Sequence, residues 1–307
     1  MRIAVTGAAG RLGRALVEGL GEAPFSGPLG PIGWTRDAFD LDEPAGVGER
    51  LDRERVEVVV HAAAWTDVDG CAREPELALR RNGEATAVLA RACAERGLDL
   101  VVVSTNEVFD GRRTDGHGYA PTDEPVPGNP YGVSKLAGER AAREAYAGAR
   151  GGVLGIVRTA WLFGPGKPDF PAKILAAARA ALERGERLRA VGDEWGSPTY
   201  TGDVADAIAE LLGEAAVDGI HHVVNAETAS RADWARDVVA RAGLPVEIED
   251  VPSSTWPRPS VAPRWGVLEP TPLPSGEPLR PWRQAMADYA PVLLRERAAA
   301  AGSGGRR

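Results

Sequence analysis

The chain has 307 residues, of which 44% are hydrophobic and 26% charged, and its formal net charge is −8. This is the composition of a soluble globular protein with a large core, and the acidic balance argues against a nucleic-acid partner, whose recognition needs a basic surface. Cys71 and Cys93 are not in CxxC spacing, which argues against a thiolate zinc site and a disulfide framework. A strand is expected from Arg2 and no apolar run matches a bilayer span, so we expect a cytoplasmic protein without signal peptide or membrane contact.

The first residues predict a strand, a glycine-rich turn and a helix. Residues 2–6 are predicted as a buried strand around the apolar run 3–5, and the turn that follows has the spacing G-x-x-G-x-x-G before a helix over 14–20. In a dinucleotide-binding turn, Gly7 permits the tight bend, Gly10 lets the backbone approach a pyrophosphate, and Gly13 lets the helix lie against the sheet. A flexible glycine-rich loop is the weaker alternative, because a strand precedes the turn and a helix follows it.

The end of the second predicted strand, residues 32–35, bears on which dinucleotide binds. Arg36 follows this strand. A guanidinium pairs with a 2′-phosphate, whereas an acidic residue accepts a hydrogen bond from a ribose 2′-hydroxyl. Arg36 therefore favours NADP(H), while Asp37 beside it leaves NAD(H) open, and a solvated surface arginine is the competing interpretation.

The third predicted strand, residues 56–61, is a continuous apolar run typical of a strand covered on both faces. Three alanines follow it, where small side chains would let a cofactor press on the backbone. We interpret His61 as a core histidine, since no second metal ligand lies at motif spacing, and no metal site is predicted. A long helix is predicted over 74–96, and from the residues alone its Asn82 is a polar core residue.

A hydroxyl, a phenol and an amine stand out in the middle of the chain. Thr105 ends the strand predicted over 100–104. Open α/β sheets bind ligands at the carboxyl ends of their strands, so this hydroxyl lies where chemistry would occur. Tyr131 and Lys135 are four apart on the helix that begins near Pro130, so they share one face, and the ammonium would favour the phenolate. Tyr-x-x-x-Lys alone is common by chance.

The remaining elements complete an alternating α/β pattern. We predict a doubly wound, mainly parallel Rossmann sheet with a smaller mixed α/β C-terminal substrate lobe. The dinucleotide-binding domain would comprise 1–158 and 199–228, the substrate-binding lobe 159–198 and 229–297, and a disordered tail 298–307. The later elements are expected at 153–157, 170–185, 188–191, 201–212, 221–224, 230–243 and 282–297.

These features and four further segments together resemble the dTDP-4-dehydrorhamnose reductase family of the extended short-chain dehydrogenases/reductases. The resemblance runs from residue 1 to about 240, with its motifs in the family's order. The four segments are AAAWTDVD at 62–69, STNEVFDG at 104–111, RTAW at 158–161 and GSPT at 196–199.

The resemblance implies NADPH-dependent reduction of the C4 keto group of a nucleotide-diphosphate-linked 4-keto-6-deoxy sugar, in deoxysugar biosynthesis. Tyr131 would give a proton to the ketone oxygen, Thr105 would hydrogen-bond that oxygen, and Lys135 would tune Tyr131 and bind the nicotinamide ribose. Cofactor contacts are expected from Tyr131 and Lys135 and from Gly7, Gly10, Arg11, Leu12, Gly13, Arg36, Asp40, Leu41, Ala62, Ala63 and Ala64. Substrate contacts are expected from Thr66, Val68, Asn106, Trp161 and Arg258. For Asn82 the resemblance implies a second interpretation, the holder of a proton-relay water behind Tyr131 and Lys135.

The sequence departs from the family at Asn106 and Glu107, where Asp and Tyr are usual. Asn106 keeps an acceptor and adds donors, so the departure bears on substrate identity more than on reaction type. An epimerase or dehydratase that retains NAD is a second hypothesis; the dehydratase needs an acidic residue beside Thr105, and Glu107 would point away if the strand continued. A non-catalytic NADP-binding regulatory subunit is the third. A homodimer is left open.

Overall fold

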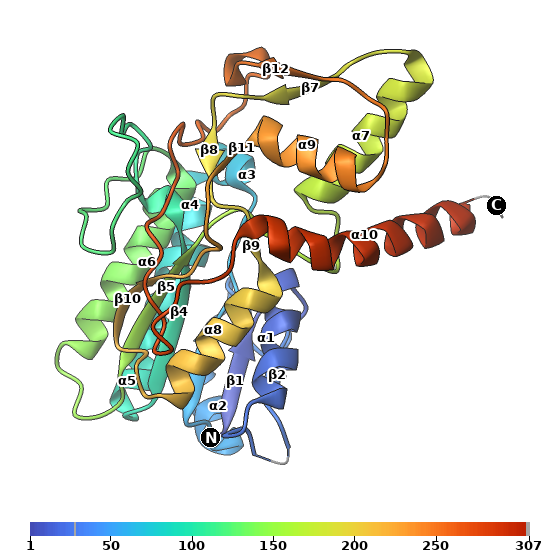
Figure 1. The fold of residues 1–307 in the computed structure, drawn as a ribbon. Helices are drawn as coiled ribbons and strands as arrows, with labels where there is room; N and C mark the ends of the chain where they lie inside the picture. Colours follow the sequence, from blue (N-terminus) through green and yellow to red (C-terminus); the bar gives the residue numbers. More distant parts are fainter. Residues whose placement is uncertain (28, 305–307) are drawn as a thin grey trace.

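The computed structural model describes residues 1–27 and 29–304, and it is built around one six-stranded parallel sheet (Figure 1). The strand order is β10-β5-β4-β3-β1-β2, which confirms the predicted doubly wound class. β2 lies on one side of β1 and β3 on the other, so the carboxyl ends of β1 and β3 flank the crevice in which such sheets bind ligands. The strands are β1 Ile3–Thr6, β2 Ile32–Trp34, β3 Val58–His61, β4 Asp99–Thr105, β5 Leu154–Thr159 and β10 Gly219–His222.

Helices cover both faces of the sheet because its strands are apolar on both sides. On one face α1 and α8 pack against side chains such as Val5 and Val101. On the other face α2, α5 and α6 pack against Val59 and Val102. Alternate residues of a strand thus enter opposite cores, as the side-chain period of two requires. These helices are α1 Arg11–Glu22, α2 Val47–Glu54, α5 Ala85–Glu95, α6 Pro130–Tyr146 and α8 Thr201–Gly213.

The helix predicted over 74–96 is continuous but contains a wider turn. α4 (Pro75–Ala78) leads into a π-helix, η1 (Leu79–Glu84), which continues into α5. Such turns are frequent at functional sites. This one carries Arg81 and Asn82, and both contact Trp65 in the loop after β3.

A smaller lobe lies above the carboxyl edge of the sheet (Figure 1). Its parallel strands β7 and β12 pack with α7 and α9, and its core contains Phe163, Trp234 and Trp282. The predicted domain boundaries stay a prediction. The elements of this region are β6 Leu162–Phe163, α7 Phe170–Arg184, β7 Leu188–Val191, β8 Trp195–Gly196, β9 Thr199–Tyr200, β11 Ala229–Ser230, α9 Arg231–Arg241, β12 Ile248–Val251 and η3 Ser253–Thr255.

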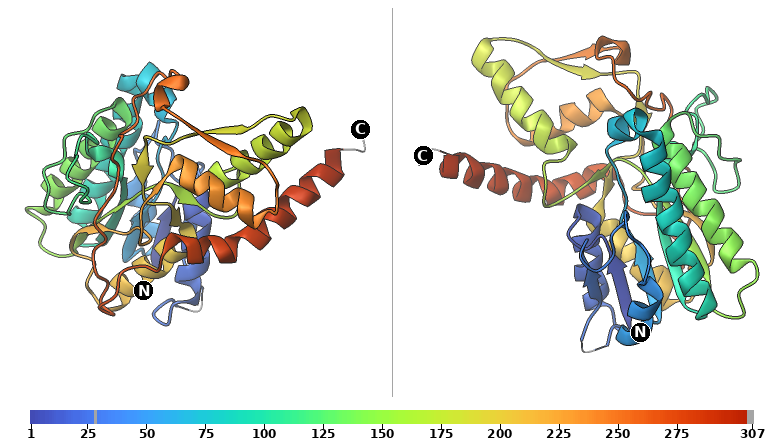
Figure 2. Two further views of the ribbon diagram at one scale, coloured as in Figure 1. Left: turned by 45° about the horizontal axis from the view of Figure 1, so that its top comes forward. Right: turned by 180° about the vertical axis from the view of Figure 1, so that it is seen from behind.

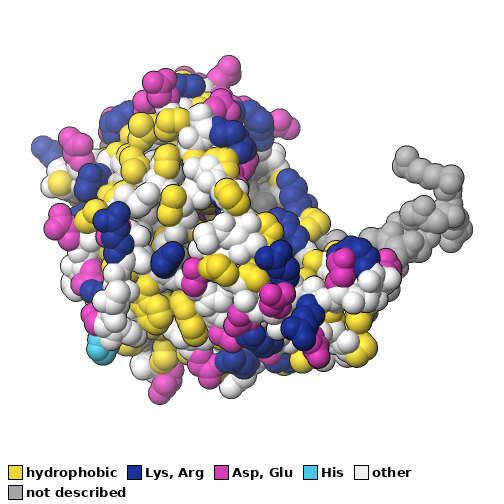
Figure 3. Space-filling model, turned by 90° about the horizontal axis from the view of Figure 1, so that it is seen from above, with side chains coloured by type: hydrophobic (Ala, Val, Ile, Leu, Met, Phe, Trp, Pro, Cys, Tyr) yellow, Lys and Arg dark blue, Asp and Glu magenta, His cyan; other side chains and the backbone are white. Residues whose placement is uncertain are grey.

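The last helix, α10 (Trp282–Gly304), packs its first turns on the smaller lobe and then extends away from the body, as both views in Figure 2 show. It continues past Arg297, where a disordered tail was predicted, and residues 305–307 of that tail lie outside the described residues. Within the described ranges, no helix is both long and apolar enough to cross a membrane. Acidic and basic side chains are interspersed on the face seen from above in Figure 3.

Candidate active site

A cavity of about 710 Å³ opens at the carboxyl edge of the sheet. The glycine turn, the loops after β2 to β5, the first turns of α6 and the start of α9 all contribute to its wall. Of the site residues predicted from the sequence, only Arg258 is not part of the lining among the described residues. The others that line it are Gly7, Gly10, Arg11, Leu12, Gly13, Arg36, Asp40, Leu41, Ala62, Ala63, Ala64, Thr66, Val68, Thr105, Asn106, Tyr131, Lys135 and Trp161.

The glycine turn has no room for side chains. Gly7 has a φ of +68°, and a Cβ built on it would lie 2.9 Å from the backbone of Ala63. A Cβ on Gly13 would lie 2.1 Å from the carbonyl oxygen of Gly7. The turn therefore brings the N-terminus of α1, with its unpaired N–H groups, against the cavity, an arrangement suited to a pyrophosphate.

We expect Gly13→Ala to destabilise the protein by about 1–3 kcal/mol and to weaken dinucleotide binding, because the added methyl must displace backbone rather than a flexible side chain. Gly21→Ala is the matched control on the same helix. There the Cβ would meet only Pro31 Cδ, at an ordinary van der Waals distance of 3.6 Å. We expect Gly21→Ala to raise the free energy of unfolding by up to about 1 kcal/mol. Urea unfolding and cofactor titration measure both effects; equal behaviour of the two variants would contradict the tight approach at Gly13.

Arg11, the first residue of α1, links the glycine turn to the smaller lobe. Its guanidinium donates to the carbonyl oxygens of Gly164 and Lys167 and lies 3.4 Å from the Asp169 carboxylate. The side chain is thus engaged with protein groups, and the backbone of Arg11 is the part that faces a bound phosphate.

Thr105, Tyr131 and Lys135 come together in this cavity from β4 and α6, and all three are buried. Asn129 caps α6 by accepting from Gly132 N at 2.9 Å, and Pro130 occupies the first helical position, so the helix begins one residue before the tyrosine. The sequence prediction that these three groups converge is consistent with this geometry.

The protonation of Tyr131 differs from the prediction that the ammonium would favour the phenolate. Burial raises the pKa of Tyr131, the negative charge of Glu107 adds to this rise, and a hydrogen bond with Thr105 opposes it. The Lys135 ammonium donates instead to the carbonyl oxygen of Val103 at 2.9 Å. Burial lowers the pKa of Lys135 to about 8, with Glu139 opposing the shift. The phenol is therefore held protonated at neutral pH.

A buried ion pair lies behind Lys135. Glu139, on the same helix, accepts from the Arg158 guanidinium at 2.7 and 3.1 Å, and from the Ser104 hydroxyl. Both members are almost completely buried, with side-chain exposures of 2% each. The pair joins α6 to β4 and β5.

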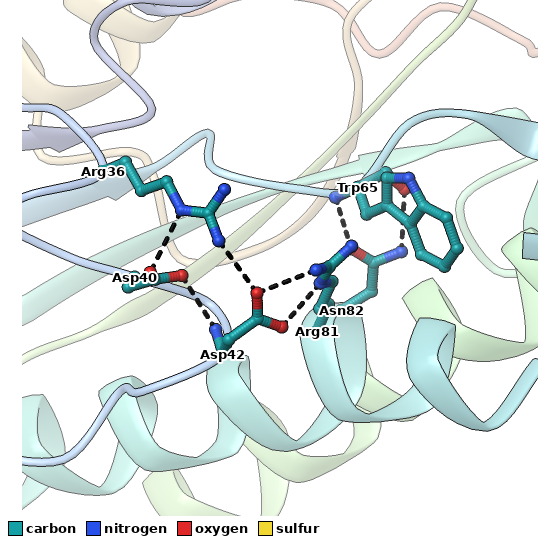
Figure 4. A network of polar contacts seen from close by, with 6 residues as sticks. All are labelled: Arg36, Asp40, Asp42, Trp65, Arg81 and Asn82. Carbon is teal, nitrogen blue, oxygen red and sulfur yellow. Dashed lines mark hydrogen bonds and ion pairs between the residues drawn. The ribbon is translucent and has the colours of Figure 1, made fainter. Parts of the chain in front are cut away.

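Asn82 is hydrogen-bonded to protein groups on two sides. Its Nδ2 donates to Trp65 O at 3.0 Å, and its Oδ1 accepts from Trp65 N at 2.8 Å (Figure 4). Nδ2 also donates to Ser134 Oγ at 3.0 Å. These bonds fit the polar-core interpretation of Asn82, and they fix the loop after β3 against α6. His61 is likewise a core histidine, bonded to Thr6 and Thr86.

At the end of the cavity beside β2, two arginines converge on one carboxylate (Figure 4). Asp42 accepts from Arg81 Nε at 2.6 Å and Nη2 at 2.8 Å, and from Arg36 Nη2 at 2.9 Å. Arg36 Nε also donates to Asp40 at 3.0 Å. The Arg81 guanidinium lies 5.1 Å from the centroid of the Trp65 ring. Asp42 belongs to the acidic segment 40–42 that the resemblance places beside the adenine, whereas Arg81 was not predicted from the sequence.

Glu107 lines the cavity, contrary to the expectation that it would point away. β4 ends at Thr105, whose Oγ1 accepts from Glu107 N at 3.2 Å, and residues Asn106–Val108 turn into the 3₁₀ helix η2. Glu107 then accepts from Asn129 Nδ2 at 2.6 Å, and burial raises its pKa. The Asn106 amide, which was expected to contact the sugar, is already engaged with protein, because its Nδ2 donates to Gly266 O at 2.9 Å.

The predicted sugar-stacking residue, Trp161, is already covered on a ring face. The Arg231 guanidinium carbon lies 3.5 Å from the centroid of the Trp161 ring. Trp161 also has a φ of +43°, an unusual conformation for a bulky residue and one that marks functional or strained positions. A sugar can stack on the covered face only if Arg231 moves.

Arg258, the predicted substrate cation, does not line the cavity, whereas Arg231, for which the sequence suggested no role, does. Arg258 donates to Asp69 of α3 (Val68–Arg73) at 3.2 Å, which fastens the C-terminal segment to that helix. Arg231 lines the cavity, and burial lowers its pKa to about 10. Its only sequence signal was a position just after the helix cap Ser230, which says nothing about the direction of the side chain.

Comparisons with known proteins agree with this geometry. A family model described as the RmlD substrate binding domain matches residues 1–294. A dTDP-4-dehydrorhamnose reductase of Streptomyces griseus is 36% identical, over 94% of this chain and 93% of that protein. The structure of a Clostridium acetobutylicum dTDP-4-dehydrorhamnose reductase covers 96% of this chain and 100% of that chain, with 28% identity and a TM-score of 0.86. The Bacillus anthracis reductase, solved in complex with NADP, covers 94% and 98%, with 27% identity and a TM-score of 0.83.

Proposed function

The chain belongs to the dTDP-4-dehydrorhamnose reductase family, and from this premise we propose that it reduces the C4 keto group of a dTDP-linked 4-keto-6-deoxy sugar with NADPH. The observation that supports the reaction most directly is the convergence of Thr105, Tyr131 and Lys135 beside a glycine turn in one cavity. A homodimer and a cytoplasmic location stay predictions of the sequence.

The residues at the glycine turn fit a dinucleotide. Gly7 and Gly13 lie so close to neighbouring backbone atoms that a Cβ at either position would overlap them. Gly10, Ala62 and Ala63 line the same wall and leave backbone exposed to a phosphate and a ribose. NADPH, when bound, supplies the hydride.

The chain's own residues handle the proton and the charge on the ketone oxygen. Tyr131 gives its phenolic proton to that oxygen, and its raised pKa keeps the proton in place until charge develops there. Thr105 hydrogen-bonds the same oxygen, and Lys135, one helical turn further along α6, binds the nicotinamide ribose. The surrounding burial strengthens each of these interactions.

The sugar nucleotide would occupy the end of the cavity that contains Thr66, Val68, Asn106 and Trp161. We expect Arg231→Met to raise the KM for the sugar nucleotide about tenfold while the KM for NADPH stays unchanged, because a cation on an anionic substrate is lost but the apolar contact with Trp161 is kept. Arg258→Met is the control. A larger effect from Arg258 would restore it as the substrate cation in place of Arg231.

The function itself is tested by one assay panel. Purified protein is mixed with NADPH and a series of nucleotide-linked 4-keto sugars, with NADH in parallel, and cofactor consumption and the reduced sugar are measured. We expect stoichiometric NADPH consumption with a dTDP-linked substrate. Isomerised or dehydrated product from a parallel set of nucleotide-linked 4-hydroxy sugars, without net cofactor consumption, would identify an epimerase or dehydratase, and tight NADP binding with no turnover would identify a regulatory subunit.

A further inference from the structure

At the β2 end of the cavity, one carboxylate and two guanidinium groups form a network, and this network bears on which ligand the cavity can bind. Asp42 binds both Arg36 and Arg81 through three N–H donors, at 2.6 to 2.9 Å. Two guanidinium groups that converge on one anion are a geometry suited to phosphate as well as to carboxylate. All three residues line the cavity at the end where the strand β2 terminates.

We infer that Arg81 is a second cation for the 2′-phosphate of NADPH and that Asp42 is the built-in anion which this phosphate must displace, so that the two residues set the discrimination between NADPH and NADH. The inference rests on the proposed function, since it concerns the same cofactor. It adds two residues, one of them from η1, to the single arginine at the end of β2.

The charges of the network indicate that a 2′-phosphate would compete with the Asp42 carboxylate for the two arginines. Arg36 and Arg81 carry two positive charges, and Asp40 and Asp42 balance them with two negative charges. The network is therefore neutral as it stands. A 2′-phosphate gains both arginines only after the Asp42 carboxylate has moved away, and Asp42 can move because its side chain is one-third exposed.

Arg81 is held in place for this role by its neighbours. The π-turn η1 directs it toward the loop after β3, where its guanidinium lies over Trp65, and Asn82 bonds both backbone groups of that tryptophan (Figure 4). Arg36 is different, because it lies on an exposed loop with its side chain 70% accessible. The fixed cation of the pair is thus Arg81.

The test measures binding without any sugar. Calorimetric titrations compare 2′,5′-ADP with 5′-AMP, which differ only in the 2′-phosphate, and NADPH with NADH. We expect Asp42→Asn to tighten 2′,5′-ADP and NADPH about tenfold, because one repelling charge within a few ångströms is removed. We expect Arg81→Met to weaken the same two ligands about tenfold, with AMP and NADH changed by less than about twofold in both variants.

Two further variants separate a specific role from a general one. Glu43→Gln removes the same charge from the same loop; Glu43 does not line the cavity, and among the described residues its carboxylate is hydrogen-bonded to neither arginine, so the change should alter all four affinities by less than about twofold. Arg81→Lys keeps the charge and should restore part of the NADPH preference that Arg81→Met loses. Higher salt should reduce the preference of the unmodified protein.

The inference is overturned if Asp42→Asn behaves like Glu43→Gln, or if Arg81→Met weakens NADPH and NADH equally, as a purely structural residue would. Failure of the proposed function looks different. If the proposed function fails, the unmodified protein binds neither dinucleotide, or binds both and reduces no keto sugar. If only the inference fails, the protein binds both dinucleotides and reduces the sugar, but the substitutions do not change the ratio of the NADPH and NADH affinities.

Discussion

Replacing Tyr131 by phenylalanine should lower kcat by about 10²–10⁴-fold and leave the affinity for NADPH unchanged. We propose the phenol as the proton donor beside the Thr105 hydroxyl, and its raised pKa keeps it protonated at neutral pH. Removing one oxygen takes away the proton and the hydrogen bond without changing the ring that fills the site. Steady-state kinetics with a dTDP-linked 4-keto sugar, together with NADPH titration, measure the two quantities separately.

The matched control for this change is Tyr146→Phe at the far end of the same helix. Tyr146 donates to Leu98 O at 2.7 Å, so the control loses one structural hydrogen bond on α6, which costs about 1 kcal/mol of stability. Turnover should stay near normal in the control. Near-normal turnover in Tyr131→Phe as well would remove the phenol from the mechanism.

Replacing Glu139 by glutamine should lower the free energy of unfolding by about 3–5 kcal/mol, the largest stability effect that we expect from one isosteric change. The substitution leaves the Arg158 cation buried without its counter-charge, at a site where both side chains have 2% exposure. The cost of an uncompensated buried charge exceeds what the ion pair itself contributes. Urea unfolding followed by circular dichroism measures the loss.

Two comparisons test the electrostatic reason. Glu186→Gln breaks a similar pair with Arg184 that is 57% exposed on both sides, and it should cost less than about 1 kcal/mol. The double variant E139L/R158M removes both charges and should recover most of the stability lost in Glu139→Gln. A double variant as unstable as the single one would assign the loss to packing instead.

The fold was predictable because its signals are local and repeated along the chain. Apolar runs such as residues 56–61 correspond to strands covered on both faces, and the glycine turn and the start of α6 were predicted within a few residues. The convergence of Thr105, Tyr131 and Lys135 also follows from local signals, since each lies at an element end on the carboxyl side of the sheet.

The missed residues depend on the direction of a side chain, which spacing does not encode. Glu107 faces the cavity because the Thr105 hydroxyl accepts from its N–H and the strand ends at Thr105, so the alternation of side chains does not extend to Glu107. Arg81 reaches the loop after β3 because one helical turn is widened. Arg231 could be placed at a helix start, but its position over Trp161 depends on how two distant segments pack.

The ion pair behind Lys135 also bears on motion. Glu139 belongs to α6, whereas its partners Ser104 and Arg158 belong to β4 and β5. A helix tied in this way cannot slide along the sheet without separating desolvated opposite charges. Tyr131 on α6 and Thr105 on β4 therefore keep a fixed position relative to each other. We expect any movement that accommodates differently shaped sugars to occur in the lobe that contains α7 and α9.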